Sequence, residues 1–148
     1  MFLPDLLKNK TILVTGGGTG LGKAMGKRFL ELGASLVICG RREEVLKATT
    51  AELNARFKDK VSYHICDIRD AGAVDAMIAA QWDRAPLDAL VNNAAGNIAS
   101  RSEDLSPRAI DAALDIAPHG TAYGTWACGK RRLAGKRLPS LRRTPCRF

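Results

Sequence analysis

A cluster of glycines near the start of the chain contains the residues best suited to chemistry. It reads Thr15-Gly16-Gly17-Gly18-Thr19-Gly20-Leu21-Gly22 and separates an apolar run at 11–14 from a stretch with helical spacing. Backbone N–H groups at a helix N-terminus point outward, and the helix dipole favours negative charge there. Glycines let such a backbone approach a pyrophosphate closely. A flexible turn is the alternative, which this position between strand and helix disfavours. We therefore predict a phosphate-binding turn formed by Gly16, Gly18, Thr19, Gly20, Leu21 and Gly22.

The elements that must position this turn alternate regularly along the chain. Short runs rich in β-branched residues are followed by stretches with the spacing of amphipathic helices. Strands are predicted at 11–14, 36–39, 61–65 and 87–91, and helices up to 32, over 43–57, over 71–82 and from 107. Right-handed crossovers turn such an order into an open parallel sheet that is covered on both faces. The predicted fold is α/β, a three-layer Rossmann-type doubly wound parallel sheet that stops after about four strands.

The net charge of +8 is confined to one end of the chain. Residues 1–115 carry 15 basic and 15 acidic side chains, which leaves all eight excess charges in residues 116–148. A basic surface spread over a folded domain is therefore excluded. A basic arm that binds nucleic acid or a membrane surface is a weaker alternative, because the arm has no regular interleaving of aromatic residues. We predict neither a nucleic-acid nor a membrane partner.

Composition also disfavours exported, membrane and metal-binding proteins. No apolar run approaches the roughly 20 residues that a membrane span needs, and residues 1–7 are too short and interrupted for a signal peptide. The cysteines show no C-x-x-C spacing, and the two histidines stand far apart. We expect reduced thiols, no metal site and a cytoplasmic location.

Two later strand ends, together with the glycine turn, resemble the short-chain dehydrogenase/reductase family. The turn matches that family's T-G-x-x-x-G-x-G pattern, Cys66-Asp67-Ile68 ends the third strand, and Asn92-Asn93-Ala94-Ala95-Gly96 ends the fourth. The resemblance covers about residues 8–128, and it implies an oxidoreductase with a dinucleotide-binding half-domain over this range. The remaining residues, 129–148, are expected to be a basic tail that is disordered or non-native.

The resemblance also implies roles for residues at these strand ends. Asp67 and Ile68 would lie against the adenine ring, although a cap for the turn before Asp70 is an alternative role for Asp67. Ala94, Ala95 and Gly96 would contact the cofactor through their backbone. Asn93 would either contact the cofactor or only hold the fourth strand by side-chain hydrogen bonds.

Within the family, the chain looks most like the 2,4-dienoyl-CoA reductases. The doubled alanine in Asn92–Asn97, followed by Leu105-Ser106-Pro107 and Gly120-Thr121-Ala122, carries this narrower resemblance. It implies a small-molecule substrate, an acyl-CoA thioester. Members of the family are usually homotetramers, and this chain would lack most of the residues of that interface.

The charge of the residues that end the second predicted strand distinguishes NAD from NADP as the cofactor. An acidic residue there would bind the ribose 2′-hydroxyl of NAD and repel a 2′-phosphate. The strand ends instead in Cys39-Gly40-Arg41-Arg42, and a guanidinium offers a bidentate fork to a phosphate. We therefore predict NADP(H), with Arg41 and Arg42 as ligands of the 2′-phosphate. A solvated arginine pair is the alternative, and Glu43 and Glu44 are expected to serve the next helix.

The catalytic residues of the family are missing from the sequence. Family members use a Tyr-x-x-x-Lys pair, but Asp67 and Ala127 stand four residues after the two tyrosines, Tyr63 and Tyr123. We assign no catalytic residue and expect a truncated chain that is unable to catalyse, with a shifted reading frame beyond about residue 128 as one hypothesis. A non-catalytic dinucleotide-binding module is the alternative function. Pro118 is expected to interrupt the helix from Pro107, because an interior proline costs roughly 3 kcal/mol.

Overall fold

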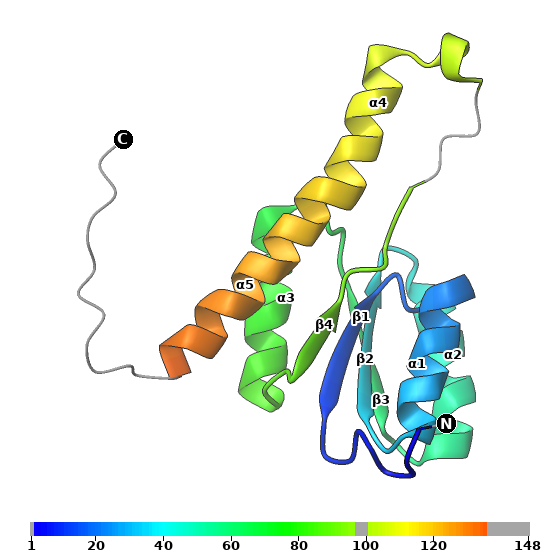
Figure 1. Ribbon diagram of the computed structural model, residues 1–148, viewed down its shortest axis with the longest axis vertical. Coiled ribbons are helices and arrows are strands. Elements are labelled where there is room, and N and C mark those ends of the chain that lie inside the picture. Colours follow the sequence, from blue (N-terminus) through cyan, green and yellow to red (C-terminus); the bar gives the residue numbers. More distant parts are fainter. Residues whose placement is uncertain (1, 97–100, 136–148) are drawn as a thin grey trace.

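Four parallel strands form one sheet in the order β3-β2-β1-β4. The computed structural model describes residues 2–96 and 101–135 (Figure 1). The strands are β1 (Thr11–Thr15), β2 (Ser35–Gly40), β3 (Val61–Ile65) and β4 (Ala89–Val91). All four lie where the sequence predicts them, to within two residues. In this part of the chain β4 forms one edge of the sheet, as expected.

Helices cover both faces of the sheet, which confirms the three-layer α/β fold. Figure 1 shows α1 and α2 on one side and α3 and α5 on the other. The helices are α1 (Gly20–Glu31), α2 (Glu43–Phe57), α3 (Ala71–Arg84), α4 (Pro107–Leu114) and α5 (Gly120–Gly135), with a short 3-10 turn at Ser102–Asp104. The acidic residues Glu43 and Glu44 lie in the first turn of α2, as predicted.

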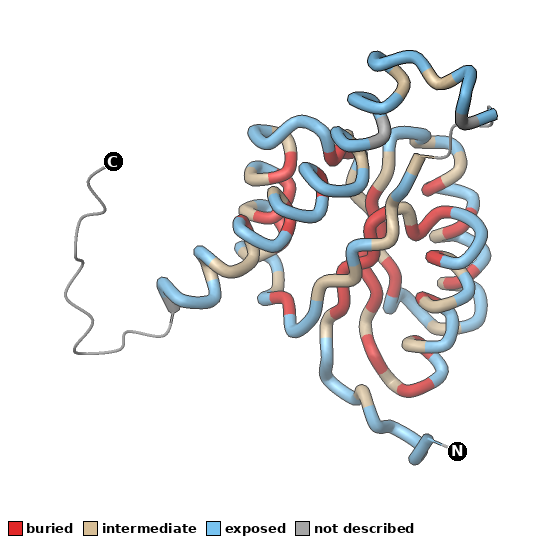
Figure 2. The backbone as a smooth tube through the Cα atoms, turned by 45° about the horizontal axis from the view of Figure 1, so that its top comes forward, coloured by how far each residue is buried: buried red, intermediate tan, exposed pale blue. Residues whose placement is uncertain are grey.

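Two separate hydrophobic clusters hold the layers together. Side chains alternate between the faces of a strand, so Ile12 and Val14 pack under α1 and α2, whereas Leu13 packs under α3 and α5. These three side chains are buried, and Figure 2 shows buried residues concentrated along the strands. A continuous apolar run is therefore needed in β1, because both of its faces are covered.

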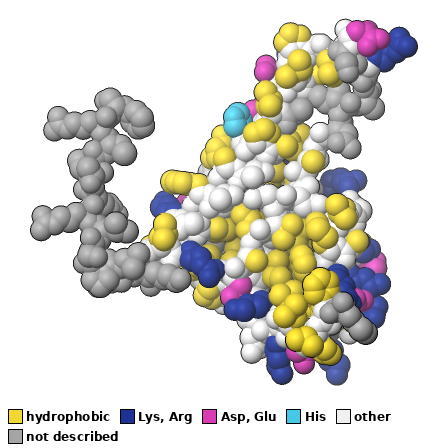
Figure 3. Space-filling model, in the orientation of Figure 1, with side chains coloured by type: hydrophobic (Ala, Val, Ile, Leu, Met, Phe, Trp, Pro, Cys, Tyr) yellow, Lys and Arg dark blue, Asp and Glu magenta, His cyan; other side chains and the backbone are white. Residues whose placement is uncertain are grey.

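The β4 edge is less protected than the centre of the sheet. Leu90 and Val91 are only half-buried, and Ala89 is exposed. Apolar side chains gather in Figure 3 over the region where Figure 1 places β1, β4 and the N-terminal residues. An unpaired strand edge with apolar neighbours favours association with other chains.

The helix that begins at Pro107 is not interrupted at Pro118, contrary to the prediction. Ser106 is its N-cap, as expected, and its hydroxyl accepts a hydrogen bond from the Ala109 N–H at 3.2 Å. Pro118 does not end the helix, because a π-helical segment at Asp115–His119 joins α4 to α5. The wider hydrogen-bonding pattern of a π-turn accommodates the proline ring without breaking the helix. Helix α5 then continues to Gly135, beyond the boundary expected at residue 128. The rest of the predicted basic tail, 136–148, lies outside the described residues.

The described residues contain neither a membrane-spanning helix nor a cluster of metal-binding side chains. None of the helices at 2–96 or 101–135 is long and apolar enough to cross a membrane. The same residues contain no group of three or more His, Cys, Asp or Glu side chains suited to a metal ion.

Candidate functional site

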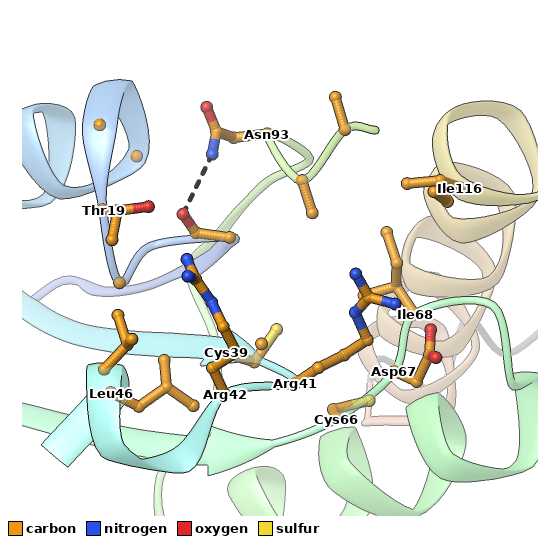
Figure 4. Close-up of a pocket in the computed structure, with 18 of the residues that line it drawn as sticks. Thr19, Cys39, Arg41, Arg42, Leu46, Cys66, Asp67, Ile68, Asn93 and Ile116 are labelled. Carbon is orange, nitrogen blue, oxygen red and sulfur yellow. Dashed lines mark hydrogen bonds between the residues drawn. The ribbon is translucent and has the colours of Figure 1, made fainter. Parts of the chain in front are cut away.

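A cleft of about 490 Å³ opens at the carboxyl ends of the strands. The loops after β1, β2, β3 and β4 form its walls, and the π-helical segment adds one residue. Ligands of open parallel sheets bind at this edge. The cleft is lined by Gly16, Gly18, Thr19, Gly20, Leu21, Gly22, Cys39, Gly40, Arg41, Arg42, Val45, Leu46, Cys66, Asp67, Ile68, Arg69, Asn93, Ala94, Ala95 and Ile116 (Figure 4). Every predicted site residue except Gly96 is in this set.

The glycine turn leaves the N-terminus of α1 open toward the cleft. Thr19 is the N-cap residue in an extended conformation, and its side chain makes no capping hydrogen bond. The first turn of α1 also contains no acidic residue. Among the described residues, neither the N-cap side chain nor an acid of the first turn caps the first N–H groups of the helix, and the helix dipole adds positive potential there. This arrangement fits a phosphate or pyrophosphate group.

Two glycines in the turn are required by their surroundings. Gly16 has a φ of +66°, and a Cβ atom there would lie 3.0 Å from the Cα atom of Ala94. At Gly22 a Cβ atom would lie only 2.5 Å from the carbonyl oxygen of Gly16. Side chains at these positions would push the turn away from β4. Glycine therefore allows the turn to close against the strand end that forms the opposite wall.

Hydrogen bonds join the ends of β1 and β4 across the base of the cleft. The Thr15 hydroxyl accepts from the backbone N–H groups of Asn93 and Ala94, each at 3.0 Å. The Asn93 side-chain amide donates to the Thr15 carbonyl at 2.9 Å and to the Gly16 carbonyl at 3.4 Å. Asn93 thus holds the fourth strand by side-chain bonds, one of the two roles anticipated for it. Gly96 packs beside Ile116 and does not line the cleft.

The two arginines after β2 project into the cleft from one loop. Both are exposed, and Figure 4 shows the Arg41 side chain extending toward Ile68 and Asp67 while Arg42 extends toward the glycine turn. No acidic residue of the β2 end lines the cleft. The pair therefore adds two positive charges to a site whose turn already favours an anion.

Asp67, which is predicted to lie beside the adenine, has a partner that was not among the predicted site residues. The Arg69 Nη2 atom lies 2.5 Å from Asp67 Oδ2, and Arg69 Nε donates to Oδ1 and Oδ2 at 3.0 and 3.1 Å. The Arg69 backbone N–H also donates to Oδ1 at 3.1 Å. The hydrogen bond from the Arg69 side chain lowers the pKa of Asp67, with a smaller contribution from the positive charge of Arg41. Asp67 therefore stabilises the turn, and α3 has a separate N-cap, Asp70.

Two buried thiols and apolar groups line the rest of the cleft. Burial raises the pKa of Cys39 to about 12 and that of Cys66 to about 11, so both are neutral thiols near pH 7. Val45 and Leu46 contribute from α2, and Ile116 contributes from the π-helical segment. The spacing of Asp67 and Arg69 was visible in the sequence, but nothing in the sequence signalled the position of Ile116.

Neither tyrosine lines the cleft. Tyr63 lies in β3, and Tyr123 lies in α5 with its ring stacked on His119 at a centroid distance of 6.1 Å. His119 is exposed, and its Nδ1 atom lies 3.0 Å from Asp115 Oδ1. The described part of the cleft therefore offers groups for binding an anion and no assigned group for proton transfer.

Comparisons with known proteins agree with this geometry. The model of the family described as short chain dehydrogenase matches residues 10–136. A probable 2,4-dienoyl-CoA reductase of Caenorhabditis elegans is 43% identical, with 88% of this chain and 43% of the relative covered. A probable 2,4-dienoyl-CoA reductase of Bacillus subtilis is 36% identical, with 84% of this chain and 49% of the relative covered. The chain thus spans about half the length of these curated relatives.

Solved structures show the same fold at similar coverage. A crystal structure of a short chain dehydrogenase from Bacillus anthracis superposes with a TM-score of 0.80 at 35% identity, covering 87% of this chain and 54% of that one. A citronellol catabolism dehydrogenase of Pseudomonas aeruginosa also gives a TM-score of 0.80, at 32% identity, covering 88% and 54% of the two chains. The family model matches most of the chain, and its matched residues 10–136 include every loop that lines the cleft; the chain belongs to the short chain dehydrogenase family.

Proposed function

We propose that the cleft binds NADP(H) and that the chain is the coenzyme-binding part of a reductase. The Arg41–Arg42 pair carries this proposal, because it stands after β2 and faces the cleft. In dinucleotide-binding sheets this strand end lies near the ribose 2′ position. A 2′-phosphate would meet two guanidinium groups here, and the loop presents no carboxylate to repel it.

The other protein groups that would contact the coenzyme are assigned from the same cleft geometry. The glycine turn and the α1 N-terminus would hold the pyrophosphate, Asp67 and Ile68 would lie along the adenine, and the backbone after β4 would continue the site. Bound NADPH would supply a hydride to the substrate. The chain's own contribution in this proposal is to bind and orient the coenzyme, and residues 8–128 form the domain that does so.

We further propose an acyl-CoA thioester as substrate, specifically a 2,4-dienoyl-CoA. Support comes from the relatives named as probable 2,4-dienoyl-CoA reductases in two distant organisms. A cytoplasmic location and a homotetrameric parent assembly belong to the same proposal. Because the chain has no Tyr-x-x-x-Lys pair, we propose that it does not reduce this substrate on its own.

Coenzyme titration tests the proposed function. Binding of NADPH and NADH to the purified chain would be followed by calorimetry, with Arg41→Gln and Arg42→Gln as the variants. Loss of a charge-assisted hydrogen bond costs about 1.5–3 kcal/mol, so we expect NADPH affinity to fall at least about tenfold while NADH affinity changes little. Arg28→Gln, which removes the same charge on α1 outside the cleft, is the matched control. Equal affinities for the two coenzymes in the wild-type chain would overturn the proposal.

A non-catalytic dinucleotide-binding module is the second candidate function. The missing Tyr-x-x-x-Lys pair favours it, since binding does not need those residues. Reversible NADPH binding by a monodisperse chain without turnover of a dienoyl-CoA would support the module. Aggregation of the chain would support a fragment of a longer enzyme, as the partly exposed β4 edge predicts.

A further inference from the structure

Arg69 is the strongest feature of the cleft that the proposed function does not use. It stands two residues after Asp67 and holds both oxygens of that carboxylate. A guanidinium that contacts both oxygens neutralises the carboxylate and also fixes its direction. The Arg69 side chain is about 44% exposed and lines the cleft, so it faces the space that a ligand would enter.

The negative charge of Asp67 lies close to the loop after β2 that carries Arg41 and Arg42. Figure 4 shows Arg41 extending toward the side of the cleft that holds Asp67, and the charge of Arg41 acts on that carboxylate. Asp115, from the π-helical segment, is a second acid close enough to Arg69 to act on it. Without Arg69, this end of the cleft would combine one or two carboxylates with the site for a phosphate dianion. Repulsion between these negative charges would disfavour NADPH, the coenzyme that carries the 2′-phosphate.

We propose that Arg69 is a specificity-determining residue, which neutralises Asp67 so that the Arg41 end of the cleft accepts a 2′-phosphate. This inference rests on the proposed function, that is, on coenzyme binding in this cleft. Arg69 acts through Asp67, so its effect falls on the coenzyme that carries the extra phosphate. A purely structural role in the Asp67 turn would instead weaken both coenzymes equally.

The test compares NADPH and NADH binding to wild type, Arg69→Gln and the double variant Asp67→Asn/Arg69→Gln. In partly aqueous surroundings, an uncompensated carboxylate near a bound phosphate changes the affinity for that phosphate by about three- to tenfold. We expect Arg69→Gln to weaken NADPH binding by this factor at low salt and to leave NADH binding within about twofold. High salt should shrink the difference, because the side chains of Asp67 and Arg69 are partly exposed to solvent.

The double variant separates charge from structure. It lacks the carboxylate as well as the guanidinium, so the wild-type ratio of NADPH to NADH affinity should return. Arg28→Gln should leave the ratio unchanged, because it removes a charge on α1 outside the cleft. An equal loss for both coenzymes in Arg69→Gln, or a ratio that stays low in the double variant, overturns this inference alone. If wild type binds neither coenzyme, the proposed function fails first and the inference fails with it.

Discussion

The Asn93 side-chain amide donates a 2.9 Å hydrogen bond to the carbonyl oxygen of Thr15, which joins the ends of β4 and β1. The bond runs between residues 78 positions apart in the chain. It complements the two backbone N–H groups that donate to the Thr15 hydroxyl. Strand β4 pairs with β1 over only three residues, and these side-chain bonds extend its attachment beyond the end of the strand. The wall of the cleft that follows β4 is positioned by this attachment.

Replacing Thr15 with valine should destabilise the fold. Thr15 is buried, and the nearly isosteric change leaves two backbone N–H groups without their acceptor. We expect a loss of about 1–3 kcal/mol in unfolding free energy, measured by urea denaturation. Thr50→Val is the matched control, because the buried Thr50 hydroxyl has no hydrogen-bond partner among the described residues. It should change stability by about 0.5 kcal/mol or less. Equal losses in both variants would contradict this account of Thr15.

Replacing Gly22 with alanine should damage both stability and coenzyme binding. The new methyl group would lie 2.5 Å from the Gly16 carbonyl oxygen and 2.6 Å from the Asn93 amide nitrogen. Forcing such a contact costs about 1–3 kcal/mol and moves the glycine turn away from β4.

The paired variant is Gly129→Ala in α5, where a Cβ atom meets nothing within 4 Å. It should stabilise the chain by about 0.5–1 kcal/mol, because alanine favours a helix over glycine. Thermal unfolding with and without NADPH measures both effects, and a tolerated Gly22→Ala would show that the turn is not tightly packed.

The loops of the site could be predicted from the sequence because sheet topology alone determines where they meet. Parallel strands end at one edge, so residues as distant as Gly16, Arg41, Asp67 and Ala94 had to converge there. The Asp67–Arg69 contact could not be predicted, because it depends on the conformation of one turn. Ile116 reaches the cleft from a π-helical segment, which no periodicity in the sequence indicated. The same segment accommodates Pro118, so a propensity rule that holds for regular α-helices gave the wrong expectation there.

Replacing Asp70 with alanine should weaken the start of α3. The Asp70 carboxylate accepts hydrogen bonds from the N–H groups of Gly72 at 2.8 Å and Ala73 at 3.0 Å. Loss of an N-cap costs about 1 kcal/mol, which urea denaturation can resolve. Asp70→Asn keeps an acceptor oxygen and should retain most of the stability. An Asn variant as unstable as the Ala variant would assign the effect to charge rather than to capping.

Stability should fall in alkaline solution through Cys39. Burial raises the pKa of this thiol from 9.0 to about 12 in the folded chain. Below pH 9 both the folded and the unfolded chain keep the proton, so the stability is fully present. Between pH 9 and 12 only the unfolded chain loses it, which costs on the order of 1 kcal/mol per pH unit. Urea denaturation from pH 7 to 11 should therefore show a steeper decline for wild type than for Cys39→Ala, which has no thiol to ionise. Parallel declines would place the alkaline sensitivity elsewhere. As an independent check, alkylation at pH 8 followed by mass spectrometry should modify Cys39 only in denaturant, because the thiolate is the reactive form.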